Sequence, residues 1–217
     1  MSADAWALLG ESLLETLYMV VVSGLVSAAI GIPLGVLLHV SRPGQILQRP
    51  VLNSVLGAVV NAARSVPFII LMVAIIPLTR LIAGTSIGTT AAIVPLSLAS
   101  IPFVARIAEG ALNEVPSGLV EAAESMGATP FQIVTRVMLP EALPGLINGM
   151  TLTLVTLVSY SAMAGAIGGG GLGDLGIRYG YQRFDPVIMI ATVIVLIIVV
   201  QLIQSAGEKL QARCEHK

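Results

Sequence analysis

Charged residues are scarce in this chain of 217 residues, at 11% of the total, whereas a soluble domain carries about 25%. The mean hydropathy is +0.94, and hydrophobic residues make up 56% of the sequence. This composition excludes an ordinary soluble domain. It also excludes a disordered chain, which would be polar and charged. The sequence therefore indicates a membrane protein with several spans.

Cysteine and lysine are almost absent. The single cysteine, Cys214, cannot form an internal disulfide or a thiolate metal cluster. The only lysines are Lys209 and Lys217, and neither follows a glycine and precedes a Ser or Thr as a nucleotide-binding P-loop requires. We therefore expect no enzyme activity and no bound cofactor or metal. The net charge of -1 offers no basic surface to nucleic acid.

Five windows are long and apolar enough to cross a membrane, which takes about 20 residues per helix. They cover residues 17–40, 55–79, 87–111, 143–163 and 186–206, all approximately. The predicted fold is an all-α integral membrane domain over residues 1–217 with five transmembrane helices. The second window holds Asn53, Asn61 and Arg64 in or just before its first half, so we predict that this half lies near the headgroups and that the second half crosses.

The basic residues predict the orientation, because cytoplasmic loops are richer in Lys and Arg. With five spans, one side receives six of them and the other receives three. The two sets are Arg42, Arg49, Arg136, Lys209, Arg213 and Lys217 against Arg80, Arg178 and Arg183. We therefore expect the N-terminus outside and the C-terminus in the cytoplasm.

Ionisable groups are missing from the span centres, where proton- or sodium-coupled transporters usually hold them. Arg106 and Glu109 lie three residues apart near the cytoplasmic end of the third span. We expect them to pair with each other or with a neighbouring loop. Any work on a gradient must then draw its energy from a partner.

Two glycine patterns have competing interpretations. A ladder of small residues at four-residue spacing, Ser23, Ser27, Gly31 and Gly35, favours either packing within the bundle or a sliding or dimer seam. Residues 171–176 read as G-x-G-x-x-G, but no strand precedes them, so a dinucleotide site is rejected. The glycine run 168–171 instead predicts a sharp bend or close packing.

The longest cytoplasmic segment, residues 115–140, reads as two short helices. Ser117 can cap the first, and Gly127 stands where a left-handed residue ends a helix. Thr129 caps the second with Gln132 in a capping box, and Pro140 is expected to stop it.

One face of each short helix is apolar. Leu119, Ala123 and Met126 share a face of the first helix; Phe131, Val134 and Val137 or Met138 share one of the second. Docking of a partner competes here with an amphipathic helix lying on the membrane. The two glutamates and the lack of bases in the first helix favour docking.

At Glu121-Ala122-Ala123, followed by Gly127 and then by Leu139-Pro140, the segment resembles the EAA loop of binding-protein-dependent ABC importers. In that family the loop forms the coupling helix that sits in a cleft of the ATPase subunit. The residues that the resemblance assigns to ATPase coupling are Glu121, Ala122, Ala123, Met126, Gly127, Ala128, Leu139 and Pro140.

The resemblance extends over nearly the whole chain, to the permease subunits of bacterial methionine importers. The matching stretches are residues 42–46, 64–68, 84–88, 126–130, 139–146 and 160–173. It implies a type I importer fold, a homodimer in the lipid of the inner membrane, two ATPase subunits that use ATP, and a periplasmic or lipid-anchored methionine-binding protein. The implied substrate is methionine in both enantiomers.

Tyr160, Ser161 and Met163 are the candidates for the translocation path and its gate, with plain packing as the alternative. Three other functions remain open. The same architecture can carry another amino acid, or the chain can be a self-sufficient exporter or channel, or a structural assembly subunit. The ordered acidic loop and the lack of intramembrane carboxylates favour the importer.

Overall fold

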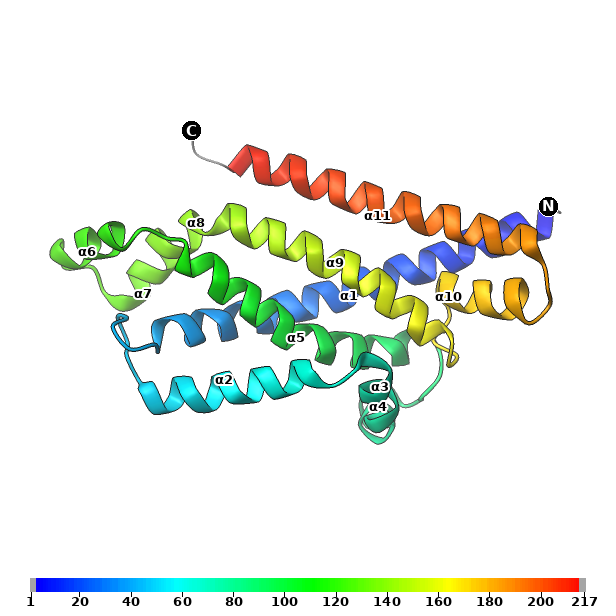
Figure 1. Cartoon of the computed structure of the whole chain (residues 1–217), viewed down its shortest axis with the longest axis horizontal. Coiled ribbons are helices and arrows are strands. Elements are labelled where there is room, and N and C mark those ends of the chain that lie inside the picture. Colours follow the sequence, from blue (N-terminus) through cyan, green and yellow to red (C-terminus); the bar gives the residue numbers. More distant parts are fainter. Residues whose placement is uncertain (1–2, 215–217) are drawn as a thin grey trace.

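Four long helices form an elongated bundle in the computed structural model, which describes residues 3–214. They are α1 (Ala3–Val40), α5 (Thr89–Asn113), α9 (Leu143–Gly165) and α11 (Pro186–Cys214), and they run along one long axis (Figure 1). The regular structure of the described residues is entirely helical, which confirms the predicted all-α fold. Lys217, one of the basic residues counted for the orientation, lies outside this range.

The described part of the chain holds four helices long and apolar enough to cross a membrane, or five if one bent pair makes a single span. Helix α1 begins at Ala3, well before the predicted start near residue 17. Helix α11 likewise continues to Cys214.

Close packing of α1 on α5 explains the ladder of small residues. Ser23 and Ser27 are fully buried, and the Ser27 hydroxyl donates to the Ser97 carbonyl at 3.3 Å. A methyl group at Gly31 would lie 2.7 Å from Val104 Cβ, so the two backbones approach as only glycine allows. The ladder therefore packs within the chain.

Substituting Gly31→Ala is expected to destabilise the bundle by about 1–3 kcal/mol, because the added methyl overpacks the α1–α5 contact. Gly10→Ala is the matched control, since a methyl there meets no atom within 4 Å. That change is expected to stabilise the helix by about 0.5–1 kcal/mol. Thermal unfolding of the detergent-solubilised variants measures both, and equal melting temperatures would contradict the close approach.

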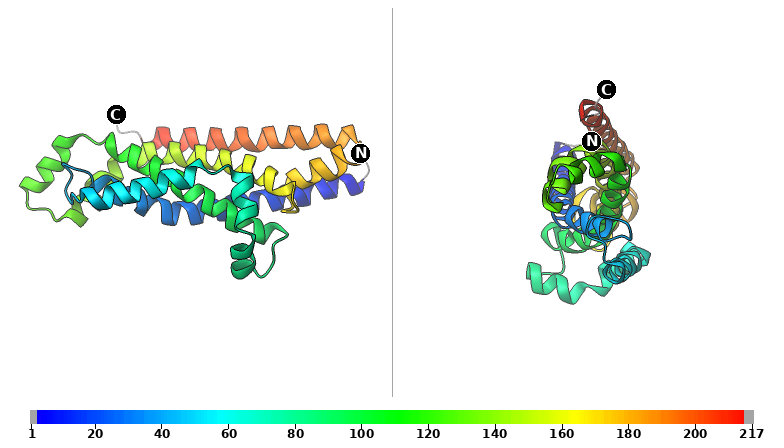
Figure 2. Two further views of the ribbon diagram at one scale, coloured as in Figure 1. Left: turned by 60° about the horizontal axis from the view of Figure 1, so that its bottom comes forward. Right: turned by 90° about the vertical axis from the view of Figure 1, so that its left-hand side faces the viewer.

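The second apolar window is broken into three helices, α2 (Pro50–Ser65), α3 (Phe68–Ala74) and α4 (Ile76–Ala83). Helix α2 runs along the bundle, and the axis of α3 is turned from it by 98° (Figures 1 and 2). The prediction that the first half lies near the headgroups and the second half crosses is therefore wrong. Val66 adopts an extended conformation, as residues before proline do, and this breaks the helix.

The polar residues of α2 bind the bundle instead of headgroups. The Asn53 side chain donates to the Leu38 carbonyl at 2.6 Å, and Arg106 donates to the Gly57 carbonyl and to Asn61 Oδ1, both at 2.9 Å. Neighbouring helices thus satisfy Asn53 and Asn61, which lets α2 lie beside them.

The glycine run bends sharply, as predicted, and it contacts α1. Gly168, Gly170 and Gly171 have positive φ, and Gly171 begins α10 (Gly171–Leu175), which is followed by the π-helical turn η2 (Gly176–Tyr181). The Gly171 N–H donates to the Glu15 carboxylate at 2.6 Å, and the Leu172 N–H donates to Thr16 Oγ1 at 2.9 Å. The N-terminal part of α1 therefore holds the α9–α10 connection.

Candidate functional site

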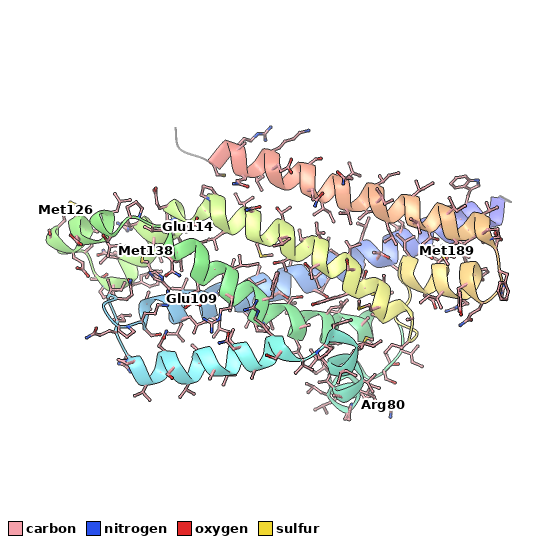
Figure 3. The ribbon with its side chains drawn as sticks, in the orientation of Figure 1. Arg80, Glu109, Glu114, Met126, Met138 and Met189 are labelled. Atoms are coloured by element: carbon pink, nitrogen blue, oxygen red, sulfur yellow. The ribbon has the colours of Figure 1, made fainter. Side chains whose placement is uncertain are left out.

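The predicted coupling segment forms a projection at one end of the bundle. It comprises α6 (Ser117–Ser125), α7 (Pro130–Ile133), the π-helical turn η1 (Val134–Met138) and α8 (Leu139–Glu141). In Figure 1 this projection extends beyond the ends of α1 and α9, and in Figure 3 Met126 lies at its tip. It is the part of the described chain that is best placed to meet a partner outside the membrane.

Local signals position the two short helices. Gly127 has φ +78°, and its N–H donates to the Glu124 carbonyl at 2.9 Å, so the predicted left-handed end of α6 is confirmed. Thr129 and Gln132 form the predicted capping box at the start of α7. Ser117 does not cap α6: it is the first helical residue, after Pro116 as N-cap.

Pro140 does not stop the second helix. The backbone stays right-handed helical from Val134 through Ala142, because the π-helical turn before Pro140 accommodates the missing N–H. The segment therefore runs directly into α9, which connects the projection to the bundle by nearly continuous helix.

The residues of the expected apolar face of α6 are not in one environment, because one is buried and two are exposed. Ala123 is 3% exposed and packs with Ile133 and Met138 of its own chain, whereas Leu119 and Met126 are exposed. The prediction that Leu119, Ala123 and Met126 form one docking face is therefore wrong. The turn at Gly127 folds α6 back against η1, and Ala123 is buried in the contact between them.

The outward surface of the projection combines apolar and acidic groups. Phe131 is 77% and Met126 is 82% exposed, and Glu121 and Ala122 are also exposed. The other residues assigned to coupling vary in exposure: Gly127 and Pro140 are exposed, while Ala128 and Leu139 are partly buried. Large exposed apolar side chains beyond the bundle are typical of a protein interaction surface.

A polar cavity of about 700 Å³ lies beside α6. It separates α6 from the connection between α1 and α2, residues 41–49, and Gln45, Asn113, Glu121 and Glu124 line it. Acceptor groups predominate on these side chains, so the cavity suits a donor group of a partner. It could not be read from the sequence, because the 41–49 segment and α6 are far apart along the chain.

A buried carboxylate anchors the base of the projection. Glu109 is 3% exposed, and its oxygens lie 2.8 Å from Arg42 and 2.6 Å from Arg106 (Figure 3). The predicted Arg106–Glu109 pair is confirmed. Asn113 Oδ1 accepts from Arg42 at 2.9 Å and lies 2.8 Å from His39 Nδ1. The cluster ties the end of α1, α2 and α5 together.

Local sequence patterns do not link Arg42 or Asn113 to this cluster. In the sequence Arg42 is a basic loop residue that bears on the orientation, and it begins the resembling stretch 42–46. Its 67-residue separation from Glu109 left no local pattern, and only the close packing of α1 on α5 brings the two together.

The three candidate pathway residues do not converge. The Tyr160 ring stacks on Phe68 with 4.5 Å between centroids. Ser161 is buried, and its hydroxyl donates to the Val158 carbonyl at 2.8 Å. Met163 is exposed and lines an apolar cavity of about 660 Å³ between α9 and α11. In this chain Ser161 therefore serves packing, whereas Tyr160 and Met163 remain accessible to a pathway.

The described residues contain no candidate metal-binding site. Among residues 3–214, no group of three or more His, Cys, Asp or Glu side chains is arranged to hold an ion. The glutamates of α6, Glu121 and Glu124, are exposed.

The sequence of the chain is similar to those of known transport proteins. Two curated relatives are each named a probable D-methionine transport system permease protein MetI. The one from Vibrio cholerae is 61% identical over 98% of this chain and 96% of its own length. The one from Pasteurella multocida is 52% identical over the whole of both chains.

Solved structures give the same picture. A chain of the MetNI methionine ABC transporter in an inward-facing conformation matches with a TM-score of 0.98 and 52% identity, over 100% of both chains. An amino acid ABC transporter crystallised with histidines matches with a TM-score of 0.70 and 18% identity, which supports the fold alone. Residues 31–212 match the family of binding-protein-dependent transport system inner membrane components. The chain belongs to that family.

Proposed function

We propose that the chain is the membrane-spanning subunit of an ATP-driven importer that carries methionine, in both enantiomers, across the cytoplasmic membrane. The observation that carries this proposal is the match to a chain of the MetNI methionine ABC transporter, with 52% identity and a TM-score of 0.98 over the full length. The permeases of Vibrio cholerae and Pasteurella multocida, named for D-methionine, support the substrate.

The complex that we propose contains two copies of this chain, two ATP-binding-cassette ATPases and a methionine-binding protein. Many large apolar side chains of α11, among them Ile190, Ile194 and Ile198, are exposed and would contact lipid or a second copy. The α6–α7 surface would contact the ATPase, with Glu121, Ala122 and Met126 at its centre. The binding protein would meet the opposite end, where α10 and the N-terminus of α1 lie (Figure 1).

This assembly sets the orientation: the N-terminus outside and the C-terminus in the cytoplasm, with the projection on the ATPase side. ATP would close the paired ATPases and draw the two α6 helices together. Since η1 and α8 connect α7 to α9 by continuous helix, the displacement would reach the bundle and favour the outward-open state. Hydrolysis of ATP would return the permease dimer to the inward-open state. ATP shifts these populations because its binding favours the closed ATPase pair.

Uptake into proteoliposomes tests the proposal. The chain is reconstituted with its genomically neighbouring ATPase and binding protein. Labelled L- and D-methionine are supplied on the side of the binding protein, and ATP is supplied on the side of the ATPase. We expect ATP-dependent accumulation that unlabelled methionine suppresses and that vesicles without the ATPase lack. Accumulation that persists without the ATPase would contradict the importer, and suppression by a different amino acid alone would contradict the substrate.

A further inference from the structure

A third cavity lies at the bend between α2 and α3, away from the projection. It has a volume of about 230 Å³, below the range of about 300–1,000 Å³ that suits drug-sized ligands. Helices α2, α3, α5 and α9 all contribute to its lining. Its size is therefore that of a single small metabolite.

One cationic side chain lines this cavity, and it is without a counter-ion. Arg42 and Arg106 share Glu109, and Arg178 pairs with Asp174, whereas Arg64 pairs with no carboxylate in the described range 3–214. Its guanidinium instead lies 5.9 Å from the centroid of the Phe103 ring. Arg64 is exposed in the last turn of α2, so its guanidinium is accessible to an anionic ligand. A guanidinium matches a carboxylate with two parallel hydrogen bonds.

The rest of the lining is mainly aromatic and aliphatic. Phe68 and Tyr160 stack with 1° between their planes, and together with Phe103 they give the cavity three rings. Aromatic rings contact thioether sulfur favourably, and they also suit aliphatic chains. The apolar part of a ligand would therefore lie against these rings while its anionic group meets Arg64.

Ser100 supplies a further polar group to the cavity. Its residue is 3% exposed. A serine hydroxyl oxygen can accept a hydrogen bond from an ammonium group. The lining includes no acidic residue, so a second positive charge on a ligand would be unfavourable next to Arg64.

We propose that this cavity is a substrate subsite, in which Arg64 binds the α-carboxylate of an amino acid and the three rings hold an uncharged apolar side chain. This inference rests on the proposed function and deepens it. The subsite has one charged anchor, and no carboxylate fixes the ammonium group. It is therefore tolerant of both enantiomers.

The position of the subsite links binding to movement. Arg64 lies just before Val66 and Pro67, and Phe68 lies just after them, so the carboxylate anchor and one ring stand on opposite sides of the 98° bend. A change in this angle separates the two and releases the amino acid. The bend thus provides the difference in affinity between two conformations that transport requires.

Cysteine protection tests the subsite directly, in the permease–ATPase complex without any binding protein. In a Cys214→Ser background, Ala63→Cys places a thiol on the exposed lining of the cavity, and the adjacent Ala62→Cys places one outside that lining. Modification by a methanethiosulfonate reagent is followed with rising methionine. We expect methionine to slow modification of Ala63→Cys but not of Ala62→Cys. Methioninol, which lacks the carboxylate, is expected to protect neither.

Adding Arg64→Gln is expected to raise the half-protecting methionine concentration about 10- to 100-fold, the usual effect of losing a hydrogen-bonded charged partner. Arg64→Lys keeps the charge, so its half-protecting methionine concentration is expected to lie between those of the wild type and Arg64→Gln. Arg80→Gln is the matched control, because Arg80 contacts Ser86 outside the cavity and is expected to leave protection unchanged.

The outcomes separate the subsite from the proposed function. If the wild-type complex imports methionine but methionine protects neither thiol, or protects both equally, the subsite is refuted and the function stands. Protection that survives Arg64→Gln unchanged also refutes it. If the wild-type complex imports no amino acid, the proposed function fails first.

Discussion

Replacing Ala122 with tryptophan is expected to reduce ATP-dependent methionine uptake about tenfold or more, while basal ATP hydrolysis by the complex continues. Ala122 is exposed on α6 beside Glu121, with no contact that the larger side chain would break within its own chain. An indole there would hold α6 away from the ATPase surface, so the stroke of the ATPases would no longer reach α9. Uptake and phosphate release, measured on the same proteoliposomes, give the two rates.

Ala58→Trp is the matched control, because Ala58 is an exposed alanine in α2, which lies along the bundle and outside the projection. It is expected to leave uptake unchanged. Normal uptake by Ala122→Trp would contradict the coupling role of α6. A complex that no longer retains the ATPase would instead place Ala122 at the centre of the interface, which is also consistent with docking.

Replacing Glu109 with alanine is expected to lower the free energy of unfolding by about 3–5 kcal/mol. The substitution leaves Arg42 and Arg106 facing each other without the buried carboxylate that both of them bind. Their mutual repulsion would separate the end of α1 from α5, at the base of the projection. Thermal unfolding in mild detergent and the yield of monodisperse protein measure the effect.

Asp174→Asn provides the comparison for Glu109→Ala. Asp174 pairs with Arg178 at 2.5 Å, but the arginine is 55% exposed, and such surface pairs contribute about 0–1 kcal/mol. A partial recovery is expected when Arg42→Met and Arg106→Met are added to Glu109→Ala, because the uncompensated charges are then removed. Equal melting temperatures for Glu109→Ala and Asp174→Asn would contradict a structural role for the buried carboxylate.

Local patterns predicted much of this molecule. The apolar windows identified α1, α5, α9 and α11, and short-range chemistry identified the Gly127 turn and the Thr129 capping box. These features depend on residues within a few positions of each other. The interactions that stabilise these features are therefore formed between residues close in the sequence.

Contacts between distant segments could not be predicted in this way. The spacing of Ala123 in the sequence predicts that it belongs to an exposed apolar face, whereas in the structure Ile133 and Met138 cover it. The bend at Pro67 had a local signal, the proline itself, which was outweighed by the continuous hydrophobicity of residues 66–79. The sequence shows Arg64 only as a charge within an apolar window, because its lack of a carboxylate partner among residues 3–214 becomes clear only when the helices are assembled.

The contact of α1 with the glycine run has a consequence for how the protein is made. Glu15 and Thr16 bind the backbone at Gly171 and Leu172, 156 residues later in each case. At a synthesis rate of about 5–20 residues per second, roughly 8 to 31 s pass before these partners leave the ribosome. During that interval the first helix has already been made, yet Glu15 and Thr16 in its N-terminal half are without these partners. Biogenesis is therefore the stage at which α1 depends most on the insertion machinery and is most open to quality-control proteases.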